Sequence, residues 1–185
     1  MVKGLREHDG PTTPKGYELH EVFSALQKEI RRGKEYEAVF WATELESFYA
    51  KNPKALWNRL RVIASEDIGL ANPLASLIVD VLEKQYDAAV ADKKDSSRLF
   101  LVHAVLYLAR SPKSRIVDNL LAVVYNDEER LEIPDYALDM HTYKGRKMGR
   151  GYEHFFAEGA KLGNQELEDP YEMEAFEALK RKKKV

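Results

Sequence analysis

The chain has 185 residues, of which 44% are hydrophobic, enough to bury the core of one globular domain without a metal or disulfide to stabilise it. Cysteine is absent, which excludes thiolate nucleophiles, disulfides and cysteine-based zinc sites and favours a reducing cytoplasm. With 29 basic and 31 acidic side chains the net charge is −2, so no overall positive charge would attract nucleic acid or an anionic membrane. No apolar run approaches the roughly 20 residues of a membrane span, and the N-terminus lacks the apolar core of a signal peptide.

The first part of the chain has the apolar spacing of helices. Residues 1–16 are rich in glycine and proline and predict a flexible lead-in. A first helix is expected over 17–32, ended by Gly33. Its apolar residues recur at i, i+3, i+4, i+7 and i+11: Leu19, Val22, Phe23, Leu26 and Ile30. A second helix is expected over 34–50, with an apolar face made by Tyr36, Val39, Phe40, Thr43 and Phe48.

Four more helices begin with cap or proline signals. These signals are Asn52 with Pro53, Asn72 with Pro73, Ser96 or Ser97, and Ser114. Gly69 ends the third helix, and Pro112 separates the fifth from the sixth. No alternating run typical of a strand appears. The sequence therefore predicts an all-α bundle of antiparallel helices joined by short loops.

The sequence changes character after Asp127. Residues 133–159 contain four glycines, aromatic residues and basic groups but only weak helical periodicity, so we expect a loop-rich segment packed on the bundle. Asp169 is placed to cap a last helix, whose acidic start and basic end suit the helix dipole. We thus expect one helical domain over 17–165, followed by a terminal helix with a basic tail over 166–185.

Two carboxylates stand where a helix disfavours them. Glu66 and Asp67 fall in the last turn before Gly69, where the negative end of the dipole costs each carboxylate about 0.3 to 1 kcal/mol. Donors from elsewhere should compensate. The turn between the fifth and sixth helices supplies cations and backbone N–H groups at Lys113, Ser114 and Arg115, so these five residues are expected to form a structural lock rather than a catalytic pair.

Four segments carry a family resemblance in the same order along residues 17–125. They are SALQKEIRRG (24–33), AVFWATELE (38–46), RVIASEDIGLANP (61–73) and AVLYLARSPKS (104–114). Together they resemble the C-terminal region of the replication-associated recombination ATPases, the MgsA and RarA group. The resemblance implies a helical domain related to the clamp-loader collar, which in that group holds AAA+ subunits together as tetramers. The group acts at stalled or damaged replication forks.

The motif that binds ATP in that group is missing. A P-loop uses glycines to bring backbone N–H groups to phosphates, followed by a lysine and a hydroxyl, and the sequence has no G-x-x-x-x-G-K-[ST]. We therefore expect a stand-alone, non-enzymatic assembly or adaptor domain in DNA replication or repair, without a cofactor. It would form a homo-oligomer, a tetramer by the resemblance, or join an AAA+ ATPase encoded elsewhere.

The alternative function is a small enzyme. PDYALDMHTYKGR (134–146) departs from what the resemblance leads us to expect, and KMGRGYEHFF (147–156) matches it only loosely. This region contains residue types of a metal or acid–base site, Asp135, Asp139, His141 and His154. Their spacing fits no established zinc or hydrolase motif, so we assign no metal. His103 is expected to lie in the core or at an interface.

A basic, glycine-containing stretch suits a polyanion such as DNA. Arginine binds phosphate through two hydrogen bonds, glycine lets the backbone approach closely, and tyrosine stacks on bases. The residues are Lys144, Arg146, Lys147 and Arg150, flanked by Tyr143 and Tyr152. The competing interpretation is a solvated loop whose arginines pair with carboxylates of the chain, and the slightly acidic net charge favours it.

Overall fold

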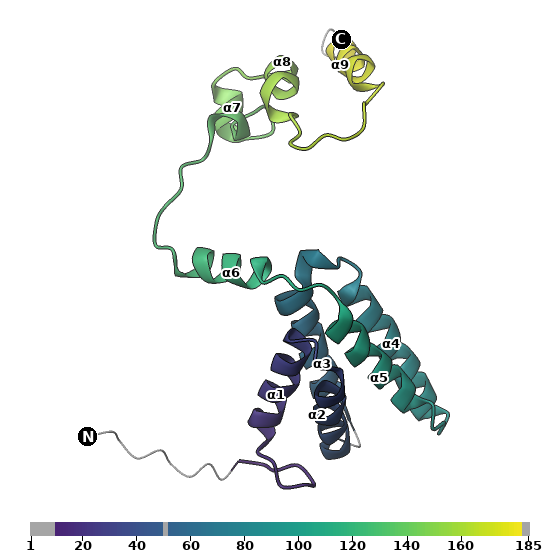
Figure 1. Cartoon of the computed structure of the whole chain (residues 1–185). Coiled ribbons are helices and arrows are strands. Elements are labelled where there is room, and N and C mark those ends of the chain that lie inside the picture. The colour runs from purple at the N-terminus through teal and green to yellow at the C-terminus, as the bar shows by residue number, and fades with distance from the viewer. Residues whose placement is uncertain (1–9, 50–51, 183–185) are drawn as a thin grey trace, which may run out of the picture. The chain divides into compact units, whose positions relative to one another are not determined.

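The computed structural model describes residues 10–49 and 52–182, and its regular elements in this part are helices joined by loops (Figure 1). The predicted all-α class is confirmed, since the described part contains no strand beyond an isolated bridge between Thr12 and Glu18. The chain divides into two units, one ending at Asp127 and one beginning at Glu128. The predicted packing of 133–159 on the bundle therefore stays a prediction, as does the boundary at 165.

The first helix follows its predicted spacing. Helix α1, Leu19–Arg31, buries Leu19, Val22, Leu26 and Ile30. Gly33 ends it with φ of +71°, a left-handed conformation that glycine adopts without steric cost. Residues 1–9 of the predicted flexible lead-in lie outside the described residues. Residues 11–18 form a hydrogen-bonded turn, in which the Thr13 N–H donates to the Tyr17 carbonyl at 2.8 Å.

Helix α2, Glu35–Phe48, buries the expected face only in part, since Val39 and Phe48 pack against the core. Tyr36 is 82% exposed, whereas Ala38, Ala42 and Leu45 are buried. The aromatic and apolar residues of this helix are distributed over nearly all of its faces, so their spacing alone did not identify the buried face. The small alanines allow α2 to lie close against α1 and α5, which pack on it.

Helix α3, Lys54–Ile63, carries Trp57 into the centre of the core and continues into a π-helical turn, Ala64–Ile68. A short 3-10 turn, Gly69–Ala71, leads to α4, Ala75–Ala91, and then to α5, Ser97–Arg110. Asn72 Oδ1 accepts from the Leu74 N–H at 3.3 Å just before α4, and the Asn72 side-chain amide donates to Tyr107 Oη at 2.9 Å and to Ser111 Oγ at 3.0 Å at the end of α5. The tight corner is thereby tied to the neighbouring helix.

The expected sixth helix forms, but it does not enter the core. Helix α6, Ile116–Asn126, begins where the Ser114 hydroxyl accepts from the Ile116 N–H at 3.3 Å. None of its residues is buried, although most are apolar. His103 on α5 is exposed as well. Its expected place in the core is therefore wrong, and a place at an interface stays a prediction.

The second unit contains short elements and one longer helix. They are a 3-10 turn, Asp135–Ala137; α7, Tyr143–Lys147; α8, Tyr152–His154; a π-helical turn, Phe155–Gly159; and α9, Glu172–Lys182. Phe156 packs on Phe176 of α9 with ring centroids 4.9 Å apart. Asp169 accepts from the Tyr171 N–H at 2.9 Å just before α9. The end of the expected basic tail, 183–185, lies outside the described residues. No helix in the described part is long and apolar enough to cross a membrane.

Candidate functional site

Asp67 is the centre of a polar network in the first unit. The π-helical turn widens the end of α3 and carries the Asp67 side chain inward, where its residue exposure is 0%. A buried carboxylate is costly unless cations and hydrogen bonds satisfy it. Arg31 of α1 donates to both of its carboxylate oxygens, and the Gln27 side-chain amide donates to Oδ2 at 3.0 Å. The cation that balances Asp67 thus comes from α1.

Arg115 brings the start of α6 into the same network. Its Nη1 donates to Glu66 Oε1 at 3.0 Å and to Asp67 Oδ1 at 3.3 Å, while its Nη2 contacts Asp118. The Ser114 N–H donates to the main-chain carbonyl of Asp67 at 2.9 Å. Of the five residues expected to meet, Glu66, Asp67 and Arg115 touch through side chains and Ser114 through its backbone.

Lys113 has a different partner from the expected one. Its Nζ donates to the carbonyls of Leu108 at 2.9 Å and Ala109 at 2.8 Å, which are unpaired at the end of α5. Burial lowers the pKa of Lys113, and the charge of Asp67 opposes that shift. Lys113 therefore caps α5 and contributes to the network through its charge.

Sequence reasoning missed Arg31 and Gln27. They are one helical turn apart beside the buried stripe of α1, a spacing that places both on one face. That polar pair next to an apolar stripe was the available signal. Nothing in the sequence indicated that α1 rather than the 111–115 turn would supply the first cation.

The two carboxylates of the expected acid–base site are paired with different side chains. Arg150 holds Asp135 through two hydrogen bonds, at 2.6 and 2.8 Å, and also donates to the carbonyls of Asp135 and Leu138. The hydrogen bond from Arg150 holds the pKa of Asp135 below its ordinary value. This carboxylate is engaged by the arginine that was expected to bind a polyanion.

Asp139 pairs with His141 instead. His141 Nδ1 lies 3.0 Å from Asp139 Oδ2, and the His141 N–H donates to Oδ1 at 2.9 Å. These hydrogen bonds lower the pKa of Asp139, and the charge of His154 adds to the shift. The Nδ1 atom of His154 is itself buried without a hydrogen-bond partner. Among the described residues, no group of three or more histidine and carboxylate side chains is arranged to hold a metal ion.

These shifts predict how the second unit responds to acid. Both folded-state pKa values are depressed, so the stability from Asp135 and Asp139 is fully present above their ordinary value of 3.8 and is lost as pH falls below it. We expect NMR signals of residues 135–159 to lose dispersion below that pH, while Asp135→Asn shows a weaker dependence on acid. An identical acid response in the variant would show that the Arg150 pair contributes nothing.

Both arginines of the basic stretch and its Gly145 make contacts within the second unit. Besides Arg150, Arg146 donates to the carbonyl of His141 at 3.1 Å. Gly145 is buried, and a Cβ there would lie 1.8 Å from the Asp139 carbonyl oxygen, so this glycine serves close packing rather than phosphate approach. Lys147 lies over the ring of Tyr143 at 4.7 Å, and Lys144 is exposed. Tyr152, at the start of α8, is partly buried.

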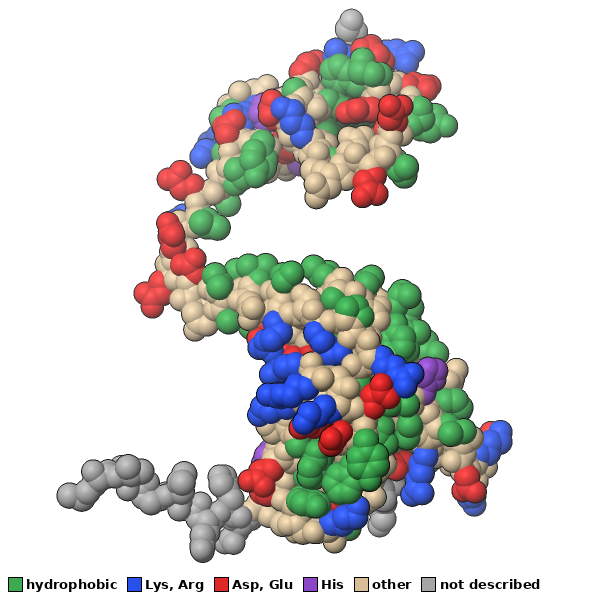
Figure 2. Space-filling model, in the orientation of Figure 1, with side chains coloured by type: hydrophobic (Ala, Val, Ile, Leu, Met, Phe, Trp, Pro, Cys, Tyr) green, Lys and Arg blue, Asp and Glu red, His purple; other side chains and the backbone are tan. Residues whose placement is uncertain are grey.

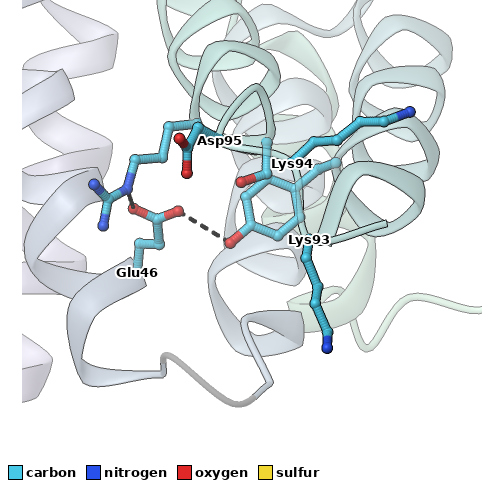
Figure 3. Close-up of a pocket in the computed structure, with 7 residues that line it drawn as sticks. Glu46, Lys93, Lys94 and Asp95 are labelled. Atoms are coloured by element: carbon cyan, nitrogen blue, oxygen red, sulfur yellow. Dashed lines mark hydrogen bonds and ion pairs between the residues drawn. The ribbon is translucent and has the colours of Figure 1, made fainter. Parts of the chain in front are cut away.

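A separate cavity of about 440 Å³ lies where α4 turns into α5 (Figure 3). The nearly buried Glu46 of α2 accepts from the Tyr86 hydroxyl at 3.0 Å and pairs with Arg98 at 3.4 Å. Burial and the nearby Glu46 charge raise the pKa of Tyr86. Figure 3 shows the amino groups of Lys93 and Lys94 pointing away from Glu46. The lining carries both signs of charge and favours no single class of ligand.

An exposed apolar surface of the first unit lies on α6 (Figure 2). Its exposed residues are Ile116, Val117, Leu120, Leu121, Val123, Val124 and Tyr125. A mostly apolar groove of about 380 Å³ separates Val117 and Leu121 from Val62 of α3. Contiguous apolar surface of this kind marks an interaction site in a water-exposed protein. The one acidic side chain within α6, Asp118, is paired with Arg115.

Comparison of the sequence with known proteins identifies the family of the chain. Residues 26–183 match the family model described as MgsA AAA+ ATPase C terminal. An uncharacterised AAA domain-containing protein of Mycobacterium tuberculosis is 31% identical over 75% of the chain and 31% of its own length. Replication-associated recombination protein A is 28% identical in Escherichia coli K12, over 77% of the chain and 32% of the relative. The Bacillus subtilis protein of that name is 29% identical over 82% and 36%.

The chain thus spans about a third of the length of the curated relatives it matches. The family match also extends beyond the four segments that carried the resemblance, and it includes 134–146. The resemblance itself is confirmed, and the chain belongs to the MgsA AAA+ ATPase C-terminal family.

Proposed function

We propose that the chain is a non-enzymatic assembly domain that acts in DNA replication or repair and associates through α6. The relatives are named for an AAA domain or for replication-associated recombination, which supports a role beside an AAA+ ATPase. The observation that carries the proposal is α6, an apolar helix with no buried residue. Such a helix gains its burial from another protein surface.

The occupant that fits α6 best is a second copy of the chain. Asp118 is the single charged residue within the helix and is paired with Arg115. Packing two copies through this surface therefore brings no like charges together and leaves no unpaired charge buried. The resemblance predicts a tetramer, and the mass in solution measures the count.

The polar network gives α6 a fixed starting direction in this proposal. Arg115, which immediately precedes α6, is held by Glu66 and Asp67, and Asp67 is held by Arg31 of α1. A buried ionic network of this kind costs desolvation but can fix one arrangement of elements. We assign Glu66, Asp67 and Arg115 the role of a structural lock between the core and the assembly helix.

The alternative enzyme needs Asp135, Asp139, His141 and His154 around one substrate. The structure engages Asp135 with Arg150 and Asp139 with His141, and no observation favours the enzyme over assembly. The expected contact with a polyanion stays a prediction. Lys144 and Lys147 are the cations best available for it, since Arg146 and Arg150 bind carbonyls and a carboxylate of their own unit.

Light scattering after size-exclusion chromatography tests the assembly proposal. We expect the wild-type chain to exceed the 21.3 kDa mass of one chain, and Leu120→Glu with Val123→Glu to reduce it to that mass, because both side chains are exposed and glutamate must be desolvated on association. Tyr36→Glu, at an exposed position on α2, is the matched control and should assemble normally. A double variant that keeps the wild-type mass would contradict the proposal.

A further inference from the structure

A surface of the first unit away from the apolar residues of α6 carries a local excess of positive charge. Lys28 and Arg31 lie in the last turn of α1, and Arg32 follows directly. Arg59 lies on α3, and Arg115 immediately precedes α6. Figure 2 shows Lys and Arg side chains gathered over the end of α1, below α6. We call these five residues the basic face, which contrasts with the net charge of −2 of the whole chain.

Hydrogen bonds join the three elements of the basic face. Arg59 Nη1 donates to Gln27 Oε1 at 3.1 Å, and the Gln27 amide donates to Asp67 Oδ2 at 3.0 Å. Asp67 also accepts from Arg31 and Arg115. Guanidinium groups from α1, from α3 and from the start of α6 are thus linked through one buried carboxylate, which fixes their positions without a ligand.

Carboxylates of the chain balance two of the five cations. Arg31 and Arg115 both bind Glu66 and Asp67, and Arg115 also binds Asp118. These contacts explain where two of the arginines point, but they leave the rest of the basic face to other partners.

The remaining three cations hydrogen-bond to neutral acceptors. Lys28 donates to Ser24 Oγ, Arg32 to the Lys28 carbonyl at 3.0 Å, and Arg59 to the side chain of Gln27. Lys28 and Arg32 are exposed, and Arg59 is partly exposed. Their positive charges therefore face water, where a negatively charged ligand can reach them.

We propose that the basic face binds the phosphate backbone of a nucleic acid. Arginine binds phosphate through two parallel hydrogen bonds, and lysine binds it as a point charge. Contacts of this kind do not read bases, so the binding is independent of sequence. The inference rests on the proposed role in DNA replication or repair and deepens it by naming the partner and its place on the first unit.

The spread of the charge favours nucleic acid over an acidic protein. Lys28 and Arg32 are four residues apart, which is about 6 Å along a helix, and Arg59 adds a charge from a second helix. A duplex carries one negative charge per about 1.7 Å of its axis, so neighbouring phosphates can neutralise all three cations at once. A single glutamate or aspartate side chain reaches one of them.

Fluorescence anisotropy with a fluorescein-labelled DNA duplex of arbitrary sequence, measured over a range of salt concentrations, tests the proposal. Lys28→Gln with Arg32→Gln changes two exposed side chains and keeps good helix formers. We expect the double variant to bind at least about tenfold more weakly at low salt, and its slope of log affinity against log salt to become shallower by about 2. Circular dichroism checks that it is folded.

The matched control removes the same charge elsewhere in the first unit. Lys84→Gln with Lys94→Gln changes exposed positions on α4 and in the turn after it, and it should bind like the wild type. An equal loss in both double variants would show that net charge alone governs binding and would overturn the site. Displacement of the duplex by polyglutamate at equal charge would replace nucleic acid with an acidic protein as the partner.

The mass in solution separates this inference from the assembly proposal. A wild-type chain that assembles but does not bind the duplex at low salt refutes the basic face and leaves assembly intact. A wild-type chain that stays at 21.3 kDa but binds the duplex, with the loss confined to Lys28→Gln with Arg32→Gln, supports the basic face and refutes assembly.

Discussion

Replacing Asp67 with alanine is expected to destabilise the first unit by about 3 kcal/mol, at the lower end of what removing one partner of a buried ion pair costs. The loss leaves the Gln27 amide and two of the N–H groups of Arg31 without their acceptor. Arg31 keeps Glu66 as a partner, which limits the effect. Urea unfolding of the full chain, followed by fluorescence of the buried Trp57, measures the change in the free energy of unfolding.

The matched control for Asp67 is an ion pair of similar geometry at the surface. Glu35 accepts two hydrogen bonds from Arg110, at 2.8 and 2.9 Å, and the hydrogen bond lowers the pKa of Glu35. Both side chains are in contact with water, so Glu35→Ala should leave the urea midpoint nearly unchanged. Equal urea midpoints for Asp67→Ala and Glu35→Ala would contradict the claim that the buried network around Asp67 contributes more to stability than an exposed ion pair.

Replacing Gly145 with alanine is expected to disrupt the fold around α7. The added Cβ would lie 1.8 Å from the Asp139 carbonyl oxygen and 2.5 Å from that of Leu138. Both are backbone atoms, so no side-chain rotation relieves the overlap. Overpacking of this kind costs about 1 to 3 kcal/mol or more, and Asp139 would be displaced from its position beside His141.

Trypsin reports this disruption because its cleavage sites lie in the same segment. Lys144, Arg146 and Lys147 are in α7, and local opening exposes the peptide bonds that follow them. We expect Gly145→Ala to be cleaved there at least about tenfold faster than the wild type, corresponding to about 1.4 kcal/mol of local stability. Gly163→Ala is the control, since nothing lies within 4 Å of a Cβ at that position. Unchanged cleavage in Gly145→Ala would refute the close-packing role.

The sequence predicted helices best where one apolar stripe was flanked by polar residues. The spacing of α1 and the stop at Gly33 are examples, because period and left-handed glycine are local properties. In α2 the buried face is made by Ala38 and Ala42, and small residues give a weak hydrophobic signal. The exposure of α6 was not predictable, since the same stripe fits a core helix or an assembly helix.

The site residues follow the same division. The need of Glu66 and Asp67 for donors followed from their place near a helix end, whereas the contribution of Arg31 depends on how α1 packs against α3. Arg150 suited a phosphate by its chemistry, but Asp135, fifteen residues earlier, already provides a carboxylate for it. Which anion an arginine binds is decided by tertiary contacts, and composition did not show them.

Hydrogen–deuterium exchange of the wild-type chain over a range of concentrations tests assembly through α6 most directly. If α6 is covered by a second copy, amides of residues 116–126 should exchange more slowly as concentration rises, because association suppresses local opening. Amides of α2 around Tyr36, which is exposed and lies outside α6, should be unaffected. Exchange in α6 that is independent of concentration, in a chain whose mass stays at 21.3 kDa, would contradict assembly through this helix.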